Sequence, residues 1–141
     1  MKRHATLAPL SRDHRRELVQ ARRVLTAAAG DADERLAAAD AYIASFFSET
    51  VAHFRREEEE LFPLYVRHAG STPLLERVLR EHMQLHGLAH TLRSEIAASD
   101  VTPETLRELG DLLQEHVRIE ERELFEEIQR LVPAAELAQL T

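Results

Sequence analysis

Two long segments of the sequence repeat apolar residues every three or four positions, which is the spacing of one face of an α-helix. In the first segment this face consists of Ile43, Phe46, Thr50, His53, Glu57, Glu60 and Leu64. In the second it consists of Leu109, Leu112, His116, Ile119 and Glu123. A seven-residue repeat is typical of helices that pack in a left-handed bundle. Because both faces change from apolar residues to His and Glu partway along, the predicted bundle has to bury polar side chains between its helices.

Capping and breaking residues divide the chain into four predicted helices. Asp31 or Asp33 caps the start of the second helix, and Gly70 stops it. Pro63 lies inside that helix, and we expect it to kink or break the last turns. The expected ranges are about 10–29, 34–68, 72–98 and 102–131, and residues 134–141 could add a short turn of helix.

The connections between these segments are short, which favours antiparallel neighbours. We therefore predict an all-α fold, an up-down-up-down four-helix bundle that forms a single domain over residues 1–141. Composition agrees, because Ala, Leu, Glu and Arg are good helix formers and only four Gly and five Pro interrupt them. A strand-based fold lacks support, since no segment alternates with period two for long.

Charge and composition exclude several classes of function. The formal net charge is -7, whereas a nucleic-acid binder usually carries a basic patch. The chain has no long apolar run that would cross a membrane and no apolar signal core after its first residues. We therefore expect a cytoplasmic protein. It has no Cys, so a bound metal would have to be held by His and carboxylate side chains.

One stretch of the sequence occurs twice. Residues 53–62 read His-Phe-Arg-Arg-Glu-Glu-Glu-Glu-Leu-Phe, and residues 116–125 read His-Val-Arg-Ile-Glu-Glu-Arg-Glu-Leu-Phe, so seven of the ten positions are identical. The matches include the His and the Glu residues four and seven positions later. The repeat suggests that the bundle consists of two related helical hairpins.

Three predicted helices carry possible metal ligands four residues apart, which places both members of each pair on one helix face. The pairs are His53 and Glu57, His82 and His86, and His116 and Glu120, and the first helix adds His14. Counted from the turns at about 1.5 Å per residue, the three pairs lie at one depth within about a turn. The depth counted for His14 agrees less well with the depth of the three pairs.

Buried together without partners, these His and Glu side chains would cost several kcal/mol per charged group. Divalent cations remove that cost, because carboxylates neutralise them and imidazole nitrogens coordinate them. Mixed imidazole and carboxylate ligands suit iron, manganese or zinc rather than calcium or magnesium. Five imidazoles and two carboxylates are too many for one tetrahedral ion and suit two metal ions with a vacant position.

The arrangement of His14, His53-x3-Glu57, His82-x3-His86 and His116-x3-Glu120 resembles the hemerythrin or HHE cation-binding family over the whole chain. The Asp13-His14 start, the Glu81-His82 pair and the run that closes on Leu-Phe-Pro are also similar. The ferritin-like di-iron proteins fit less well, since they use Glu-x2-His on two helices and no His here has a Glu three residues before it.

The resemblance implies a four-helix bundle with two non-haem iron ions, bridged by two carboxylates and an oxo or hydroxo group. It implies terminal ligands at His14, His53, His82, His86 and His116 and bridges at Glu57 and Glu120. The animal oxygen carriers use an Asp five residues after the last His, whereas this chain has Glu120 four residues after it. The longer side chain argues against simple reversible oxygen carriage. Whether Glu60, Glu123 or His90 joins the site is left open.

Three functions fit these observations. In the first, the di-iron centre binds or senses a small diatomic ligand or oxidant, such as oxygen, nitric oxide or a change of redox state. A stand-alone sensor would need an unknown protein partner for its output. In the second, the protein is a di-iron enzyme that consumes peroxide or supplies iron for repair. In the third, it is a helical interaction module whose His cluster holds zinc or nothing.

Overall fold

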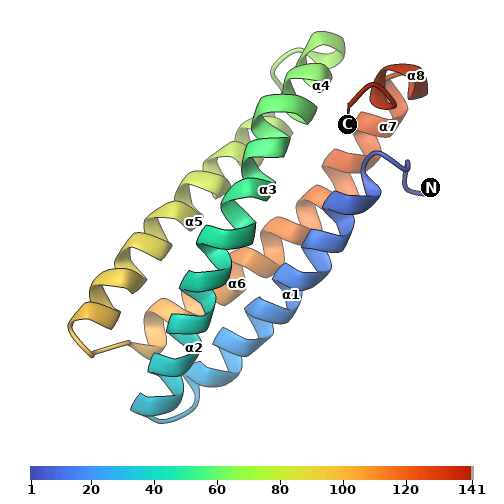
Figure 1. The fold of residues 1–141 in the computed structure, drawn as a ribbon. Helices are drawn as coiled ribbons and strands as arrows, with labels where there is room; N and C mark the ends of the chain where they lie inside the picture. Colours follow the sequence, from blue (N-terminus) through green and yellow to red (C-terminus); the bar gives the residue numbers. More distant parts are fainter. Residues whose placement is uncertain (141) are drawn as a thin grey trace.

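The computed structural model describes residues 1–140, and within them all regular secondary structure is helical (Figure 1). The first helix, α1, spans Ala8–Ala28, and a long run follows it as α2 (Ala32–Ser45), η1 (Phe46–Thr50), α3 (Val51–Arg56), η2 (Glu57–Leu61) and α4 (Phe62–Ala69). The remaining helices are α5 (Pro73–Ala97), α6 (Pro103–Ile119), η3 (Glu120–Leu124), α7 (Phe125–Leu131) and α8 (Ala134–Leu137). The all-α prediction is therefore confirmed for the described residues.

The helix ends lie where the capping residues predict them. The side chain of Asp31 accepts a hydrogen bond from the backbone N–H of Glu34, so Asp31 rather than Asp33 caps α2. Thr72 and Thr102 cap α5 and α6 in the same way, each followed by proline in the first turn. Gly70 ends α4 with a φ of 71°, a conformation that glycine adopts without steric cost.

We expected Pro63 to kink or break the second helix near its last turns. A break does not occur, because the chain stays helical from Ala32 to Ala69. Proline lacks an N–H and its ring clashes with the carbonyl four residues before it in an α-helix. The π-helical segment η2 ends at Leu61, two residues before Pro63, and widens the backbone there. The segment η3 at Glu120–Leu124 is also π-helical and lies at the equivalent place in the repeat, although no proline follows it there.

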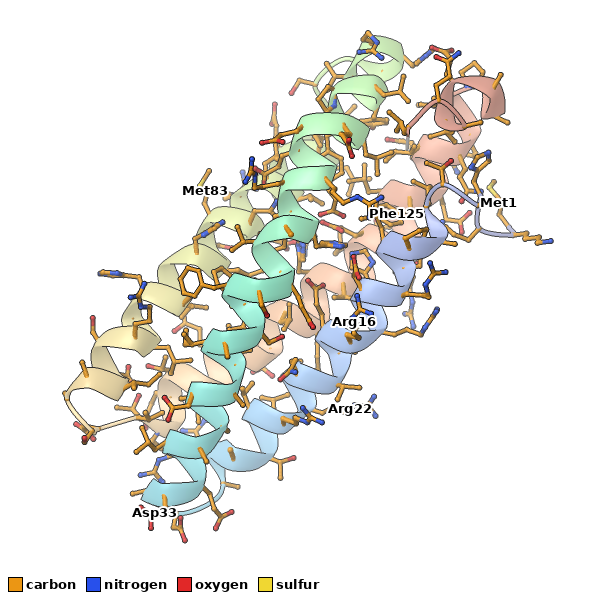
Figure 2. The ribbon with its side chains drawn as sticks, in the orientation of Figure 1. Met1, Arg16, Arg22, Asp33, Met83 and Phe125 are labelled. Carbon is orange, nitrogen blue, oxygen red and sulfur yellow. The ribbon has the colours of Figure 1, made fainter. Side chains whose placement is uncertain are left out.

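The helices pack side by side as a bundle, with α1 along both α2 and α6, and α5 against α2 and α6 (Figure 1). Figure 2 shows Arg22 and Asp33 directed away from the bundle, whereas Phe125 lies between the helices and is fully buried. Helices α1 and α6 lie close together at Gly110, where an added Cβ would lie 2.5 Å from Leu25 Cγ.

Two apolar clusters fill the interior. One contains Phe46, Leu85 and Leu113, and the other contains Leu61 and Phe125 near the end of the bundle where the termini lie. Along each long helical run, the His and Glu residues singled out by the sequence fall between members of the two clusters. Among residues 1–140, no helix combines the length and the apolar character needed to cross a membrane.

Candidate metal centre

A layer of buried polar side chains separates the two apolar clusters. Its members come from α1, α3, α5 and α6 and from the first residues of η2 and η3, and each is at most 3% exposed: His14, His53, Glu57, His82, His116 and Glu120. Helical periodicity brings them inward, because each lies about one turn from an apolar core residue on its own helix. The depth mismatch of His14 disappears in the structure.

The first half of the layer is formed by His14, His53, Glu57 and Glu120, each of which offers one ligand atom within 4.8 Å of the others. His14 Nε2 lies 2.8 Å from Glu120 Oε2 and 3.1 Å from His53 Nε2. His53 Nε2 lies 3.2 Å from Glu57 Oε2. Two imidazole nitrogens and two carboxylate oxygens thus point at one small volume.

The second half is formed by His82, His116 and Glu120. Glu120 Oε1 lies 3.1 Å from His82 Nε2 and 2.9 Å from His116 Nε2. Glu57 Oε1 lies 3.4 Å from His82 Nε2. Both carboxylates therefore direct Oε2 toward the first half and Oε1 toward the second, as a carboxylate that bridges two ions would.

Several atoms of this layer are buried without a well-directed hydrogen bond, although each lies within ion-pair distance of another group of the layer: both carboxylate oxygens of Glu57, Glu120 Oε2 and His116 Nε2. Buried polar groups in native proteins are almost always partnered, and a buried unpaired charge is strongly destabilising. Divalent cations would satisfy all of these atoms at once. The donor set of imidazole and carboxylate groups, with no sulfur, therefore fits one or two such ions.

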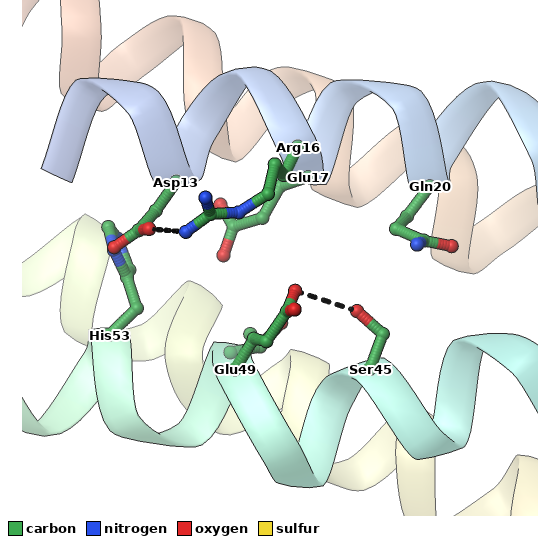
Figure 3. A pocket seen from close by; sticks show the side chains of 8 residues that line it. Asp13, Arg16, Glu17, Gln20, Ser45, Glu49 and His53 are labelled. Carbon is green, nitrogen blue, oxygen red and sulfur yellow. Dashed lines mark hydrogen bonds and ion pairs between the residues drawn. The ribbon is translucent and has the colours of Figure 1, made fainter. Parts of the chain in front are cut away.

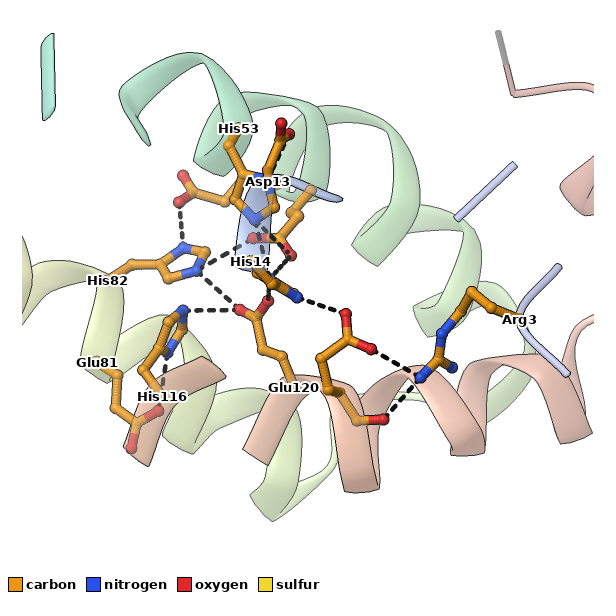
Figure 4. Close-up of polar contacts among 11 residues, drawn as sticks. Arg3, Asp13, His14, His53, Glu81, His82, His116 and Glu120 are labelled. Carbon is orange, nitrogen blue, oxygen red and sulfur yellow. Dashed lines mark hydrogen bonds and ion pairs between the residues drawn. The ribbon is translucent and has the colours of Figure 1, made fainter. Parts of the chain in front are cut away.

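Each of the four imidazoles contacts, through its outward-facing Nδ1, a carboxylate on a different helical run (Figure 4). Asp13 Oδ2 lies 3.0 Å from His53 Nδ1, and Glu58 Oε2 lies 2.6 Å from His82 Nδ1. The Nδ1 atom of His116 lies 2.9 Å from Glu81 Oε1, and that of His14 lies 2.6 Å from Glu121 Oε1. With Nδ1 engaged in this way, every Nε2 is left facing the centre.

These four carboxylates form a closed ring around the bundle. Each is the sequence neighbour of a residue in the polar layer, yet it reaches the imidazole of the next helical run: α1 to α3, η2 to α5, α5 to α6, and η3 back to α1. Arginines hold three of them in turn, since Arg16 pairs with Asp13, Arg77 with Glu81, and Arg3 with Glu121. Carboxylates behind metal-bound imidazoles fix ring orientation and raise basicity.

Without a cation, protons occupy this layer. Burial opposes protonation of His53, but Glu57 and Asp13 outweigh it and raise its pKa to about 10. Burial likewise opposes protonation of His82, and Glu120 with its neighbours raises that pKa to about 11. Burial disfavours charge on Glu120 too, yet the facing imidazoles hold its pKa well below the usual value. Metal binding must therefore release protons.

The structure does not bring His86 together with the other predicted ligands. His86 is exposed, and its ring lies edge-on to Phe46 and Phe54, with centroid distances of 5.3 and 5.8 Å. The interior at that level is filled by these rings and by Leu85. His90 is exposed as well.

Glu60 and Glu123 are also exposed, although the seven-residue spacing places them on the inner face. The π-helical segments explain this, because each adds a residue to a turn and so rotates the following side chains. Leu61 and Leu124 take the inward positions instead.

The four carboxylates of the ring were not among the predicted site residues. Asp13 and Glu81 were noted only as part of the family resemblance, and Glu58 and Glu121 were overlooked. Their adjacency to Glu57 and Glu120 was the available signal, but only the packing shows which imidazole each one reaches. A further buried acid, Glu17, was also missed. It lies one turn beyond His14 and is 6% exposed.

Comparison with known proteins agrees with this geometry. A family model described as the hemerythrin HHE cation binding domain matches residues 6–128, a span that contains all of the polar layer and its ring of carboxylates. No curated protein and no solved structure matched the chain.

Proposed function

This chain belongs to the hemerythrin HHE cation-binding domain family, and on that premise we propose that it is a non-haem di-iron protein. Its role in this proposal is to bind or sense a small diatomic ligand or an oxidant, such as oxygen, nitric oxide or a change of redox state. The observation that carries the proposal is that two buried carboxylates each direct their two oxygens toward different groups of imidazoles. Glu57 and Glu120 each present one oxygen to the His14 and His53 side and the other to the His82 side.

In this proposal His14 and His53 would hold one ion and His82 and His116 the second, and Glu57 and Glu120 would each serve both. Iron would supply two redox-active ions with coordination positions left for a small ligand, and manganese or zinc fits the same donors. Since His86 lies outside the layer, each ion would receive two imidazoles. Fewer protein ligands leave more room for an exogenous one.

The surrounding residues orient the ligands and exclude water. The ring of Phe54 stacks on His82 with centroids 3.9 Å apart, and Phe125 lies 5.2 Å from the ring of His14. Asp13, Glu58, Glu81 and Glu121 retain the Nδ1 protons of the four imidazoles, so that each Nε2 is free to coordinate. A dry, pre-oriented pocket of this kind protects a reactive ion from water.

We also propose that the chain is a single-domain, up-down-up-down four-helix bundle. Its four columns would be α1, the run from α2 to α4, α5, and the run from α6 to α7, with α8 as a terminal turn. The packing of α1 on α2 and α6, and of α5 on the same two helices, supports this topology.

Metal analysis and visible absorption of protein purified aerobically from iron-supplied cells test the proposal. We expect close to two irons per chain and near-ultraviolet to visible bands of a ferric centre. Protein that is metal-free and equally stable, or that retains zinc in the presence of iron, would contradict it.

The same donor set also suits a catalytic alternative, in which the protein consumes peroxide or donates iron. Stopped-flow spectroscopy separates the two functions. A stable spectrum with oxygen or nitric oxide supports binding, whereas rapid consumption of added peroxide supports an enzyme.

A further inference from the structure

Beside the metal centre, a small pocket lies between α1 and the run that contains α2 and η1 (Figure 3). It contains about 240 Å³ of space, including the part continuous with solvent, and one of its walls is the imidazole of His53. Three carboxylates line it: Asp13 and Glu17 from α1, and Glu49 from η1. Arg16 also lines the pocket, but its guanidinium is paired with Asp13. Glu17 and Glu49 thus leave the pocket with an excess of acidic side chains between the surface and a proposed metal ligand.

Glu17 is the innermost of these carboxylates and has no partner. Its side chain is directed into the space between the two helices (Figure 3), and both of its oxygens are buried without a hydrogen bond. Asp13 differs, because it is engaged by His53 and by Arg16. An ionised carboxylate in such a position is costly unless a cation or a proton accompanies it.

Glu49 lies at the outer side of the pocket and is exposed. Its carboxylate extends from η1 toward α1, where it accepts a hydrogen bond of 3.4 Å from Ser45 Oγ (Figure 3). The segment η1 is π-helical, and such segments often occur at functional sites because they redirect side chains. Here η1 contributes both Glu49 and the buried Thr50 to the pocket.

We infer that this pocket is a loading site for divalent metal ions, with Glu49 at its mouth and Glu17 as its inner ligand. The inference rests on the proposed di-metal function. Glu49 would attract a hydrated ion to the pocket. The two free oxygens of Glu17 would then replace some of its water ligands and hold it beside His53. From there the ion could reach the inward-facing Nε2 atoms. Negative charge that lines a narrow, low-dielectric opening raises the local concentration of cations.

A proton on Glu17 is the competing occupant. Burial raises the pKa of Glu17, while the nearby imidazoles of His53 and His14 oppose that rise when protonated. If Glu17 served only as a neutral buried acid, an amide in its place would leave metal uptake unchanged. The rate of metal uptake by a Glu17→Gln variant therefore distinguishes a metal-binding Glu17 from a neutral, protonated one.

The test follows anaerobic uptake of Fe²⁺ by chelator-treated protein, stopped at intervals with an excess of a strong Fe²⁺ chelator. We expect Glu17→Gln to take up iron about tenfold more slowly than the wild type and to reach the same final content. Glu49→Gln should be slowed less. The matched control is Glu104→Gln, which removes the same charge from a side chain that is 75% exposed at the start of α6.

Uptake by Glu17→Gln at the wild-type rate would overturn the loading site, as would a lower final iron content at an unchanged rate. If Glu17→Gln failed to fold by circular dichroism, Glu49→Gln would decide, and a wild-type rate would again overturn the inference. Failure of the proposed di-iron function is separate, because the wild type itself would then retain fewer than two irons.

Discussion

The substitution Glu81→Gln isolates one link of the carboxylate ring. Glu81 Oε1 lies 2.9 Å from Nδ1 of His116, and Glu81 does not face the centre itself. Glutamine keeps the length of the side chain and retains an oxygen that can accept the same hydrogen bond. What it removes is the negative charge that orients His116 and raises the basicity of its Nε2.

Changes to carboxylates behind metal-bound imidazoles weaken metal affinity by roughly 10- to 100-fold. Because the glutamine oxygen still accepts from Nδ1, we expect the lower end of that range, about tenfold or about 1.4 kcal/mol of binding free energy. The effect should fall on the ion that we propose His82 and His116 to hold. The ion held by His14 and His53 should lose much less, since Asp13 and Glu121 support those ligands.

Competitive titration with a chelating indicator measures both affinities. Glu115→Gln is the matched control, because Glu115 also pairs with Arg77 but is 41% exposed and contacts no site imidazole. We expect its affinities to equal those of the wild type. Equal affinities for Glu81→Gln and Glu115→Gln would show that the ring does not support the centre, and the reasoning from the Nδ1 contacts would be refuted.

Three further predictions concern ligands, protons and packing. Glu120→Ala should lose most bound iron, whereas His86→Ala should keep it by metal analysis, because His86 lies outside the polar layer. In metal-free protein, burial opposes protonation of His116, but Glu120 outweighs it and raises the pKa from 6.5 to about 9. That imidazolium stabilises the fold below pH 6.5 by up to about 3 kcal/mol, and the contribution is lost as pH rises through 9. Urea unfolding at pH 6.5 and 9.5 checks this, and higher stability at pH 9.5 would contradict it. Gly110→Ala should destabilise by about 1–3 kcal/mol because its Cβ meets α1. Gly87→Ala, where the Cβ meets open space, should stabilise by roughly 1 kcal/mol.

The opposed effects of protons and metal have a common origin in the polar layer. Imidazolium and carboxylate groups compensate one another in the metal-free protein, so acid favours that state. A bound cation requires neutral imidazoles, so its affinity rises with pH. Iron should therefore be released on acidification before the bundle unfolds.

The internal repeat has a counterpart in the structure. His53 and Glu57 occupy the same places relative to η2 as His116 and Glu120 do relative to η3, because η2 begins at Glu57 and η3 begins at Glu120. The wider turn accompanies the inward direction of these carboxylates. Pro63 occurs in only one of the two copies, so proline is not the cause of the π turn.

The sequence by itself determined the helices and most of the polar layer. Capping residues such as Asp31 and Thr72 and stop residues such as Gly70 act within a few residues, so the helix ends can be predicted from the local sequence. The four-residue spacing of His53 and Glu57 likewise specifies one face of a helix. These features depend only on local geometry, which is why they could be predicted.

Tertiary structure alone decided which candidates converge. His86 has the same spacing from His82 as Glu57 has from His53, yet it is excluded because Phe46 and Phe54 fill the interior at its level. The ring of carboxylates and the unpartnered Glu17 depend on contacts between helices far apart in the sequence. The depth of a side chain in a bundle is set by helix tilt, by π turns and by the packing of neighbours, and no local pattern encodes these.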